Sequence, residues 1–593
     1  MHISKLTRNT MYRLLPVQVL LSLVGVINGI VSSLFAGNFV GVKAMTAVGL
    51  YAPVTQLIIA LNIMLLSGSL ILCGEYLGRN DHDKVQKVFS IDMVISGLFA
   101  VLVVIGHLVF WFSGSFTTYT EDPEVSRMLC KYVLGQALGI IPLVLGSQLS
   151  SFLSLENKNK RTMTASLSYI AVNFLFNYLF VAVMKLEALG LALAPAIGMW
   201  VYFLIQAPPF FSKKAIIRFS LKGLDVREAA SIIKIGIPGA ANDGYIALRG
   251  VIVNSLIMTF VGGVGISAFT AANSILSFFW QIPEGMVLVS RMMISVSVGE
   301  EDRKGLTDIM RVAFWRFIPF LFIMAAVIML FAEPFTRIIY RDPSDPVYLM
   351  TIRGFQILPL CMPLSIVCTH FLCYFQATGK HILVHLMAIL DGVIGVVAFT
   401  MLLIKSAGIN GVYIANVLNG LIAIVVVSVY ACYKKKGLPK NMDEFMALPS
   451  DFGVPEEKRM EVTMNNMESV IGVSEAVHKF CRKRNIDEHR AFLASLFLEE
   501  MAGNVVEHGF SADKRSHYVH ICAACKKETL ILSIKDDCIP FDFDERRKIM
   551  DPDDKTKNIG IRIVSGLASD IKHQNILGLN VMTIRLDAPA FSQ

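Results

Sequence analysis

The hydrophobic character of this chain changes abruptly near residue 433, and this change constrains its fold more than any single motif. Long apolar segments precede it, and a polar stretch of mixed charge follows from about Met442. The whole chain is 54% hydrophobic and only 17% charged, and this charged fraction is well below that of soluble proteins. The sequence therefore predicts a polytopic membrane part joined to a separate water-soluble domain.

The apolar part contains about twelve stretches long enough to cross a hydrocarbon core of roughly 30 Å. They must be helices, because backbone groups cannot stay unpaired in lipid and the stretches are too long for barrel strands. The first six expected spans cover residues 14–36, 44–74, 89–114, 127–155, 163–184 and 188–211. The second six cover residues 230–260, 266–298, 312–333, 349–376, 382–404 and 409–432.

The net charge of +8 comes from basic residues on alternate loops, whereas intervening loops such as 117–125 contain acids. This positive-inside pattern places both termini in the cytoplasm of a protein of the plasma (inner) membrane, and it argues against nucleic acid as a partner. The basic loops contain Arg79, Lys84 and Lys87; Lys158, Lys160 and Arg161; Lys213, Lys214, Arg218 and Lys222; Arg303, Lys304 and Arg311; and Lys434, Lys435 and Lys436.

The two halves of the membrane part repeat each other. Three segments recur at an offset of 221 to 224 residues: 40–47 and 264–271, 78–81 and 299–302, and 190–194 and 411–415. The offset equals six spans, so both halves enter the membrane from the same side and form two parallel six-helix bundles around a midplane cavity. The expected domains are a first bundle at 1–225, a second at 226–436, a linker at 437–459 and a cytoplasmic domain at 460–593.

The membrane part resembles the multidrug and toxic compound extrusion (MATE) exporters over about residues 10–435. The resemblance rests on the two halves, on a Gly-x-x-Ala-x-x-Ala stretch after spans 1 and 7, and on the segment 78–81 that closes span 2. It implies export of organic cations and other amphipathic small molecules in exchange for Na⁺ or H⁺. Ser32 replaces an aspartate of many members, and Asn173 with Asn177 replaces an Asn…Asp pair, so we expect any ion coupling to run through the second half.

Few charged residues remain inside the expected spans. Asp391 lies in the eleventh span, and Glu284 and Arg291 lie two helical turns apart on one face of the eighth. A charge at membrane depth costs several kcal/mol, so these residues are candidates for a transport pathway. The alternatives are a structural ion pair or a place nearer the membrane surface, and the same choice applies to Asp243 and Arg249 in the seventh span.

The polar domain has the pattern of an α+β fold. Hydrophobic periodicity predicts two helices and three strands, at residues 465–484, 488–508, 518–525, 529–535 and 580–586. No Gly-x-x-x-x-Gly-Lys-[Ser/Thr] motif occurs, which excludes a P-loop ATPase. The only CxxC, Cys522 with Cys525, lies on a predicted strand that points its two thiols to opposite faces, which argues against a metal or redox site.

Three segments of this domain carry a different nucleotide signature. Glu500, Asn504 and His508 recur every four residues on one helix face, where a carboxylate can orient an attacking group and a carboxamide can bind Mg²⁺. Asp536 ends an apolar strand and can accept a hydrogen bond from the amino group of adenine. Gly560 begins an apolar helical run whose backbone N–H groups can meet phosphates.

In this order the segments resemble the histidine-kinase-like ATPase superfamily, most closely its anti-sigma-factor serine kinases, over about residues 460–590. The resemblance implies an ATPase-like sandwich that binds ATP with Mg²⁺, with Glu500 as catalytic carboxylate, Asn504 as Mg²⁺ ligand, and His508, Asp536 and Gly560 as further ATP contacts. Cys538 and the single Gly560 depart from the usual glycines, so serine kinase activity stays open. The charged stretch 542–558 is either a lid over the nucleotide or a solvated loop.

Two functions from different classes fit these features. The first is a MATE-like antiporter with an ATP-binding regulatory domain. The second is a membrane-anchored serine kinase or nucleotide sensor that acts on a cytoplasmic regulatory protein and uses its transporter-like part as a sensor. Retention of Asp391 and Glu284 favours the first function, whereas the neutral Ser32 and Asn177 favour the second.

Overall fold

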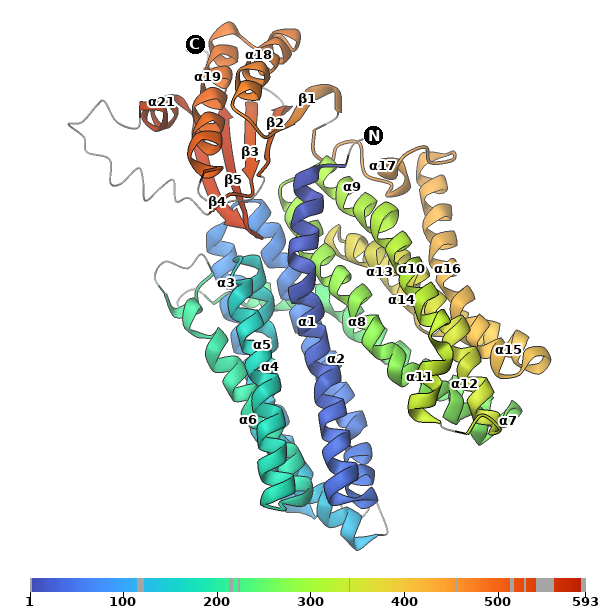
Figure 1. Ribbon diagram of the computed structural model, residues 1–593. Coiled ribbons are helices and arrows are strands. Elements are labelled where there is room, and N and C mark those ends of the chain that lie inside the picture. Colours follow the sequence, from blue (N-terminus) through green and yellow to red (C-terminus); the bar gives the residue numbers. More distant parts are fainter. Residues whose placement is uncertain are drawn as a thin grey trace.

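The computed structural model has a membrane part of long helices and a smaller α+β domain at one end of it (Figure 1). It describes residues 3–114, 122–212, 217–221, 224–340, 342–454, 456–511, 517–526, 529–539 and 559–587. Within these ranges, nothing is said of the side chains at positions 33, 37, 38, 42, 45, 243, 456 and 559–561. The predictions for the acidic loop near 117–121, for the side chain of Asp243 and for the stretch 542–558 therefore lie outside the described residues.

The first bundle consists of six helices, and two short π-helical segments continue the first and the fifth. The helices are α1 (Lys5–Phe35), α2 (Val42–Gly78), α3 (His82–Ser113), α4 (Pro123–Leu155), α5 (Asn159–Asn177) and α6 (Glu187–Gln206). The π-helical segments are η1 (Ala36–Val40) and η3 (Tyr178–Val183). A 3-10 turn, η4 (Pro208–Phe211), follows α6.

The second bundle repeats this arrangement with more interruptions. Its elements are α7 (Val226–Phe260), α8 (Gly263–Gly299), α9 (Arg303–Val312), η5 (Ala313–Phe317), α10 (Ile318–Leu330), α11 (Ala332–Ile339), α12 (Pro346–Ile357), η6 (Leu358–Leu360), α13 (Cys361–Ala377), α14 (His381–Ile389), η7 (Leu390–Ile394), α15 (Gly395–Ala407) and α16 (Ile409–Lys435). Eleven helical segments of the described chain are long and apolar enough to cross a membrane. The one remaining expected span, the seventh, is α7, a helix of 35 residues that contains the charged Lys234 and Arg249.

The internal repeat is visible in the backbone at the ends of α2 and α8. Each of these helices begins after a glycine with positive φ, Gly41 at 108° and Gly262 at 88°. Each ends in a turn that holds a left-handed residue, Asn80 or Glu301, and then the aspartate that caps the next helix. All these pairs are 221 residues apart. The sequence match of 40–47 with 264–271 has an offset of 224, so the structure corrects it by three residues and pairs Gly41 with Gly262.

The two bundles meet along a seam formed by α1 and α2 of the first and α7 and α8 of the second. The bundles lie close together beside the α+β domain and diverge with distance from it (Figure 1). Glycines allow the helices to approach so closely. A Cβ at Gly68 would overlap the backbone oxygen of Ile232, and a Cβ at Gly299 would overlap that of Glu75.

Gly299→Ala is expected to destabilise the seam, because the added methyl group has to displace the backbone of α2. Overpacking of this kind typically costs about 1–3 kcal/mol, so the apparent melting temperature in detergent should fall by several degrees. Gly97→Ala on α3 is the matched control, since no atom lies within 4 Å of its Cβ position. Equal melting temperatures for the two variants would mean that α2 and α8 do not pack as closely as described.

The α+β domain contains a five-stranded antiparallel sheet in the order β1-β2-β3-β5-β4. The strands are β1 (Arg459–Met464), β2 (Val519–Lys526), β3 (Thr529–Asp536), β4 (Asp570–Ile576) and β5 (Leu579–Leu586). The helices are α18 (Glu468–Lys483), α19 (Glu488–Asn504) and α21 (Ile559–Leu567). The linker contains the short helix α17 (Met442–Phe445) and the 3-10 turn η8 (Glu456–Lys458). Alternate residues of β3 point into an apolar core that these strands share with α18 and α19.

The other face of the sheet lies against the membrane part. The predicted helices and strands of this domain are confirmed, but β1 and β4 are additions to the prediction. Both are edge strands: β1 alternates polar and apolar residues over only six positions, and β4 is polar at five of its seven positions. Cys525 packs at the core and Cys522 lines the opposite face, as the strand geometry predicted. A cavity of about 350 Å³ remains between this polar face and the α2–α3 and α8–α9 turns.

Candidate functional site

The end of α19 carries the first segment of the predicted nucleotide site. Glu500 and Asn504 lie one turn apart and are half-buried. Neither side chain has a hydrogen bond or ion pair with another described residue. The α-helix ends at Asn504 and continues as the π-helical turn η9 (Val505–Gly509), so the regular spacing does not extend to the exposed His508. Glu500 and Asn504 are therefore the two side chains of this segment that remain available to a ligand.

Asp536 is the last residue of β3 and is only 4% exposed. Its Oδ1 accepts hydrogen bonds from the Asn580 side chain, at 2.8 Å, and from the backbone N–H of Cys538, at 3.0 Å. Burial raises the pKa of Asp536 above its ordinary value, and the bonds from Asn580 and Cys538 oppose this shift. The carboxyl group is thus fixed at a strand end, in the place predicted for an adenine contact.

The three predicted segments come together in space. Helix α19 packs against both β3 and α21. A Cβ at Gly509, just beyond α19, would lie 3.0 Å from the Cys538 sulfur. Gly560 is the second residue of α21, which confirms that an apolar helix begins there.

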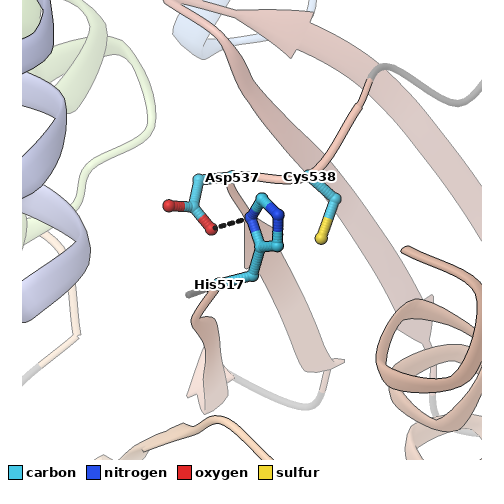
Figure 2. Close-up of side chains that lie close together, drawn as sticks. All are labelled: His517, Asp537 and Cys538. Carbon is cyan, nitrogen blue, oxygen red and sulfur yellow. Dashed lines mark hydrogen bonds and ion pairs between the residues drawn. The ribbon is translucent and has the colours of Figure 1, made fainter. Parts of the chain in front are cut away.

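A cluster of three side chains adjoins Asp536. Figure 2 shows the imidazole of His517 between Asp537 and Cys538. His517 Nδ1 lies 3.2 Å from Asp537 Oδ1, which also accepts a hydrogen bond from the Tyr518 N–H at 3.1 Å. This is the one group in the described part of the chain whose three ligand atoms lie close enough, within 4.8 Å, to hold a metal ion. The two bonds to Asp537 fix the turn after β3 to the start of β2, and so support the position of Asp536.

These residues fit an adenine nucleotide. The buried carboxyl of Asp536 is oriented by two donors. Among the described residues, the side chains of Glu500 and Asn504 have no partner, and they lie at the end of a helix that packs on the same strand. A carboxamide such as that of Asn504 suits Mg²⁺, which prefers oxygen ligands.

The second bundle holds a polar centre around Asp391, in the π-helical segment η7 within the eleventh span. The Asn419 side chain on α16 donates to both Asp391 Oδ1 and the Asp391 carbonyl, at 2.9 Å each. Arg249 of α7 and the Cys368 thiol of α13 lie within electrostatic range of the same carboxylate. Three elements of the second bundle, α7, α13 and α16, thus place polar groups around the one acid of η7.

The first bundle has a neutral counterpart on the equivalent span. Asn177 donates to the Asn173 carbonyl and to its side-chain oxygen, at 2.9 and 2.8 Å. Asn173 donates to Asn28 Oδ1 on α1 at 3.0 Å. Asn173, Asn177 and Ser32 are all buried, so this bundle holds a chain of amides where the second bundle holds a charge.

Glu284 and Arg291 lie two turns apart on α8, next to the seam, but their surroundings differ. Glu284 is exposed and has a partner, whereas Arg291 is half-buried and its Nε has no hydrogen bond within the described structure. On the same helix, a Cβ at Gly285 would meet Val19 of α1, so this part of α8 packs against the first bundle. The structure does not bring either residue to the Asp391 centre.

The model of the MatE family matches residues 18–179 and 245–400, which is more than half of the chain and covers corresponding parts of both bundles. The chain belongs to the MatE family. A second family model, the histidine kinase-like ATPase domain, matches residues 463–586. The protein is therefore an integral membrane protein of the MatE family that carries a histidine kinase-like ATPase domain.

Curated relatives of this MatE protein cover only part of it. The probable multidrug resistance protein NorM of Bacillus subtilis is 26% identical over 292 residues, which are 47% of this chain and 61% of NorM. The multidrug export protein MepA of Staphylococcus haemolyticus is 23% identical over 267 residues, which are 43% of this chain and 57% of MepA. The chain thus spans about three fifths of the length of these relatives.

Solved structures agree on the fold of the MatE part. A multidrug resistance MATE transporter in its outward-facing conformation superposes with a TM-score of 0.65 at 20% identity, over 71% of this chain and 94% of that chain. A mutant of the Vibrio cholerae MATE transporter VcmN gives a TM-score of 0.66 at 17% identity, over 74% of this chain and 98% of that chain. At such identities the likeness establishes the fold.

Sequence reasoning missed the partners of the MatE polar centres. Asn28 lies in an apolar run and Asn419 is one of three asparagines in its span, so neither is distinguished from the other polar residues of its own span. The position of Asn419 on the span after that of Asp391 could have indicated the contact, because consecutive antiparallel helices are neighbours. The role of Asn580 could not be found in this way, since it depends on the register of β5 against β3.

Proposed function

We propose that this protein is a secondary transporter that exports amphipathic or cationic small molecules in exchange for Na⁺ or H⁺, and that its cytoplasmic domain binds Mg-ATP to regulate that transport. Membership of the MatE family and the two bundles repeated in parallel support the transport function. The names of the curated relatives, multidrug resistance and multidrug export proteins, support the class of substrate.

The observation that carries the proposal is the Asp391 centre. A carboxylate held inside a span by Asn419, with a cation nearby, is the arrangement expected of a site that binds and releases H⁺ or Na⁺. The first bundle offers only amides at the equivalent place. Coupling is therefore assigned to the second bundle, while Asn173, Asn177 and Ser32 line the first half of the pathway.

A regulatory role for ATP is supported by the connection between the two parts. Lys535 and Asp536 are successive residues of β3, so their side chains point to opposite faces of the sheet. Asp536 belongs to the nucleotide site, and Lys535 forms ion pairs with Glu300 and Asp302 of the membrane part at 2.7 and 2.9 Å. One site of this kind does not provide the paired sites of an ATP-driven pump, but it is well placed to sense a nucleotide. We infer from the basic loops that this domain and both termini lie in the cytoplasm.

A second function is favoured by the neutral first bundle. In that case the protein is a membrane-anchored serine kinase in which Glu500 orients the serine hydroxyl of a cytoplasmic regulatory protein, and the bundles sense a ligand without transporting it. The chain of Asn28, Asn173 and Asn177 has no group that releases a proton, which suits a sensor better than a coupled carrier.

Reconstitution of the full chain in proteoliposomes separates the two functions. With a Na⁺ or H⁺ gradient across the membrane, the transporter is expected to move ethidium, a lipophilic cation, against its own gradient, and dissipation of the ion gradient should stop this flux. ATP should change the rate but should not drive flux when no ion gradient is present. Absence of gradient-dependent flux, together with transfer of radioactive phosphate from ATP to a co-purified protein, would support the sensor kinase instead.

A further inference from the structure

The cytoplasmic domain holds the end of the first bundle with its β4–β5 hairpin. The N–H of Leu577, in the turn of this hairpin, donates to the carbonyl of Leu155 at the end of α4, at 3.0 Å. Arg13 on α1 donates from Nη2 to the carbonyls of Leu577 and Gly578, at 2.9 Å each. The side chain of Gln574 on β4 adds a buried bond to a carbonyl at the end of α2, at 2.9 Å.

The hairpin turn is seated in a built socket. Ile576 and Leu577 are each 3% exposed and belong to the same apolar cluster as the ends of α1, α4, α8 and α9. Gly578 has a φ of 76°, and a Cβ there would overlap the Arg13 guanidinium. Only glycine satisfies both conditions without strain, so the fit of the turn depends on the absence of a side chain.

The same domain holds the second bundle through the other face of its sheet. Lys535 is 15% exposed and lies between Glu300 and Asp302, in the turn that joins α8 to α9. Burial would lower the pKa of Lys535, but the two acids together raise it above its ordinary value, so the lysine is charged. Lys304, at the start of α9, pairs in turn with Glu461 of β1 at 2.6 Å.

These contacts lie on both sides of the seam. The hairpin belongs to the same sheet as Lys535, because β5 pairs with β3 and places Val581 opposite Lys535. A rigid sheet is thus bonded to α1, α2 and α4 through its β4–β5 hairpin and to the α8–α9 turn through Lys535. The bundles are closest together on this side, where α2 and α8 touch at Gly299.

We propose that the cytoplasmic domain is a clamp across the seam, and that one of its two contacts must release before the neighbouring ends of the bundles can separate. A pair of parallel bundles that opens alternately to the two sides needs this separation once in each cycle. Only the role of the clamp in a transport cycle rests on the proposed function. The clamp itself holds the closed ends of the bundles together whether or not a solute is carried.

Hydrogen–deuterium exchange on the full chain in detergent tests the clamp, because it reports the opening of local structure without any transport. Lys535→Gln removes the buried ion pairs with Glu300 and Asp302 of the second bundle. Arg13→Gln breaks the contact with the first bundle. Lys526→Gln is the matched control, because Lys526 and its partner Glu301 are both 47% exposed and such pairs contribute little.

In each variant, hydrogen–deuterium exchange is measured at the contact that the substitution leaves intact. In Lys535→Gln, exchange at the end of α4 and in the hairpin turn should rise by about tenfold or more, and in Arg13→Gln the same rise should occur at the α8–α9 turn. Lys526→Gln should match the wild type at both places. A rise confined to the contact that was altered would mean that the two contacts are independent, and it would overturn the clamp. If one variant does not fold, the other still decides the question.

Failure of the clamp is distinguishable from failure of the proposed function. A protein that moves no ethidium can still show exchange at the distant contact, because no solute enters the measurement. If the protein transports ethidium but exchange rises only at the altered contact, the proposed function stands and the clamp is rejected.

Discussion

Asp391→Asn is expected to reduce ion-gradient-driven efflux to the level of protein-free vesicles. The substitution keeps a side-chain oxygen that can accept the hydrogen bond from Asn419 but removes the group that takes up a proton or offers a full charge to Na⁺. The first bundle has Asn173 and Asn177 at the equivalent place, so no acid on the equivalent span can replace Asp391. Flux of ethidium in proteoliposomes under an imposed Na⁺ or H⁺ gradient measures the effect.

The control for this experiment is Asp342→Asn, which neutralises an exposed acid of the same bundle just before α12. Its flux and its yield should match the wild type. Glu284→Gln is expected to abolish coupled flux as well, if Glu284 contributes to the same pathway. Unchanged flux in both Asp391→Asn and Glu284→Gln would show that coupling does not run through the second bundle.

Asn504→Ala is expected to weaken Mg-ATP binding by at least about tenfold, which corresponds to about 1.4 kcal/mol. The carboxamide supplies an oxygen ligand for Mg²⁺, and alanine supplies none. Helix α19 should still form, because alanine is the best helix former. Titration calorimetry on the full chain, with and without Mg²⁺, gives the affinity, and the loss should be confined to the Mg²⁺-dependent part.

Two glutamates provide the comparison for Asn504. Glu500→Ala should leave ATP affinity nearly unchanged and remove any phosphoryl transfer, because a carboxylate in this place orients the attacking group. Glu499→Ala is the matched control on the exposed side of the same turn and should change neither quantity. Equal affinities for the wild type and Asn504→Ala at saturating Mg²⁺ would identify this part of α19 as an ordinary solvated helix face.

The local features of both parts were accessible from the sequence. Span length, the alternation of basic loops and the offset of 221 residues each depend on neighbours along the chain, and they predict the helices, the sidedness and the repeat. The segments around Glu500, Asp536 and Gly560 were predicted for the same reason, since each is a short pattern on one element. Edge strand β1 was missed because its alternation covers only six residues, and β4 was missed because most of its residues are polar on both faces.

Only the tertiary structure decided which distant residues meet. No pattern in the chain pairs Lys535 with Glu300 and Asp302, or seats Leu577 on the carbonyl of Leu155, because these contacts join segments that are hundreds of residues apart. The sequence by itself determined that a transporter-like and a nucleotide-binding module share one chain. Their joint geometry follows from the three-dimensional fit of a hairpin turn and one buried lysine, and such a fit has no periodicity that a linear sequence can reveal.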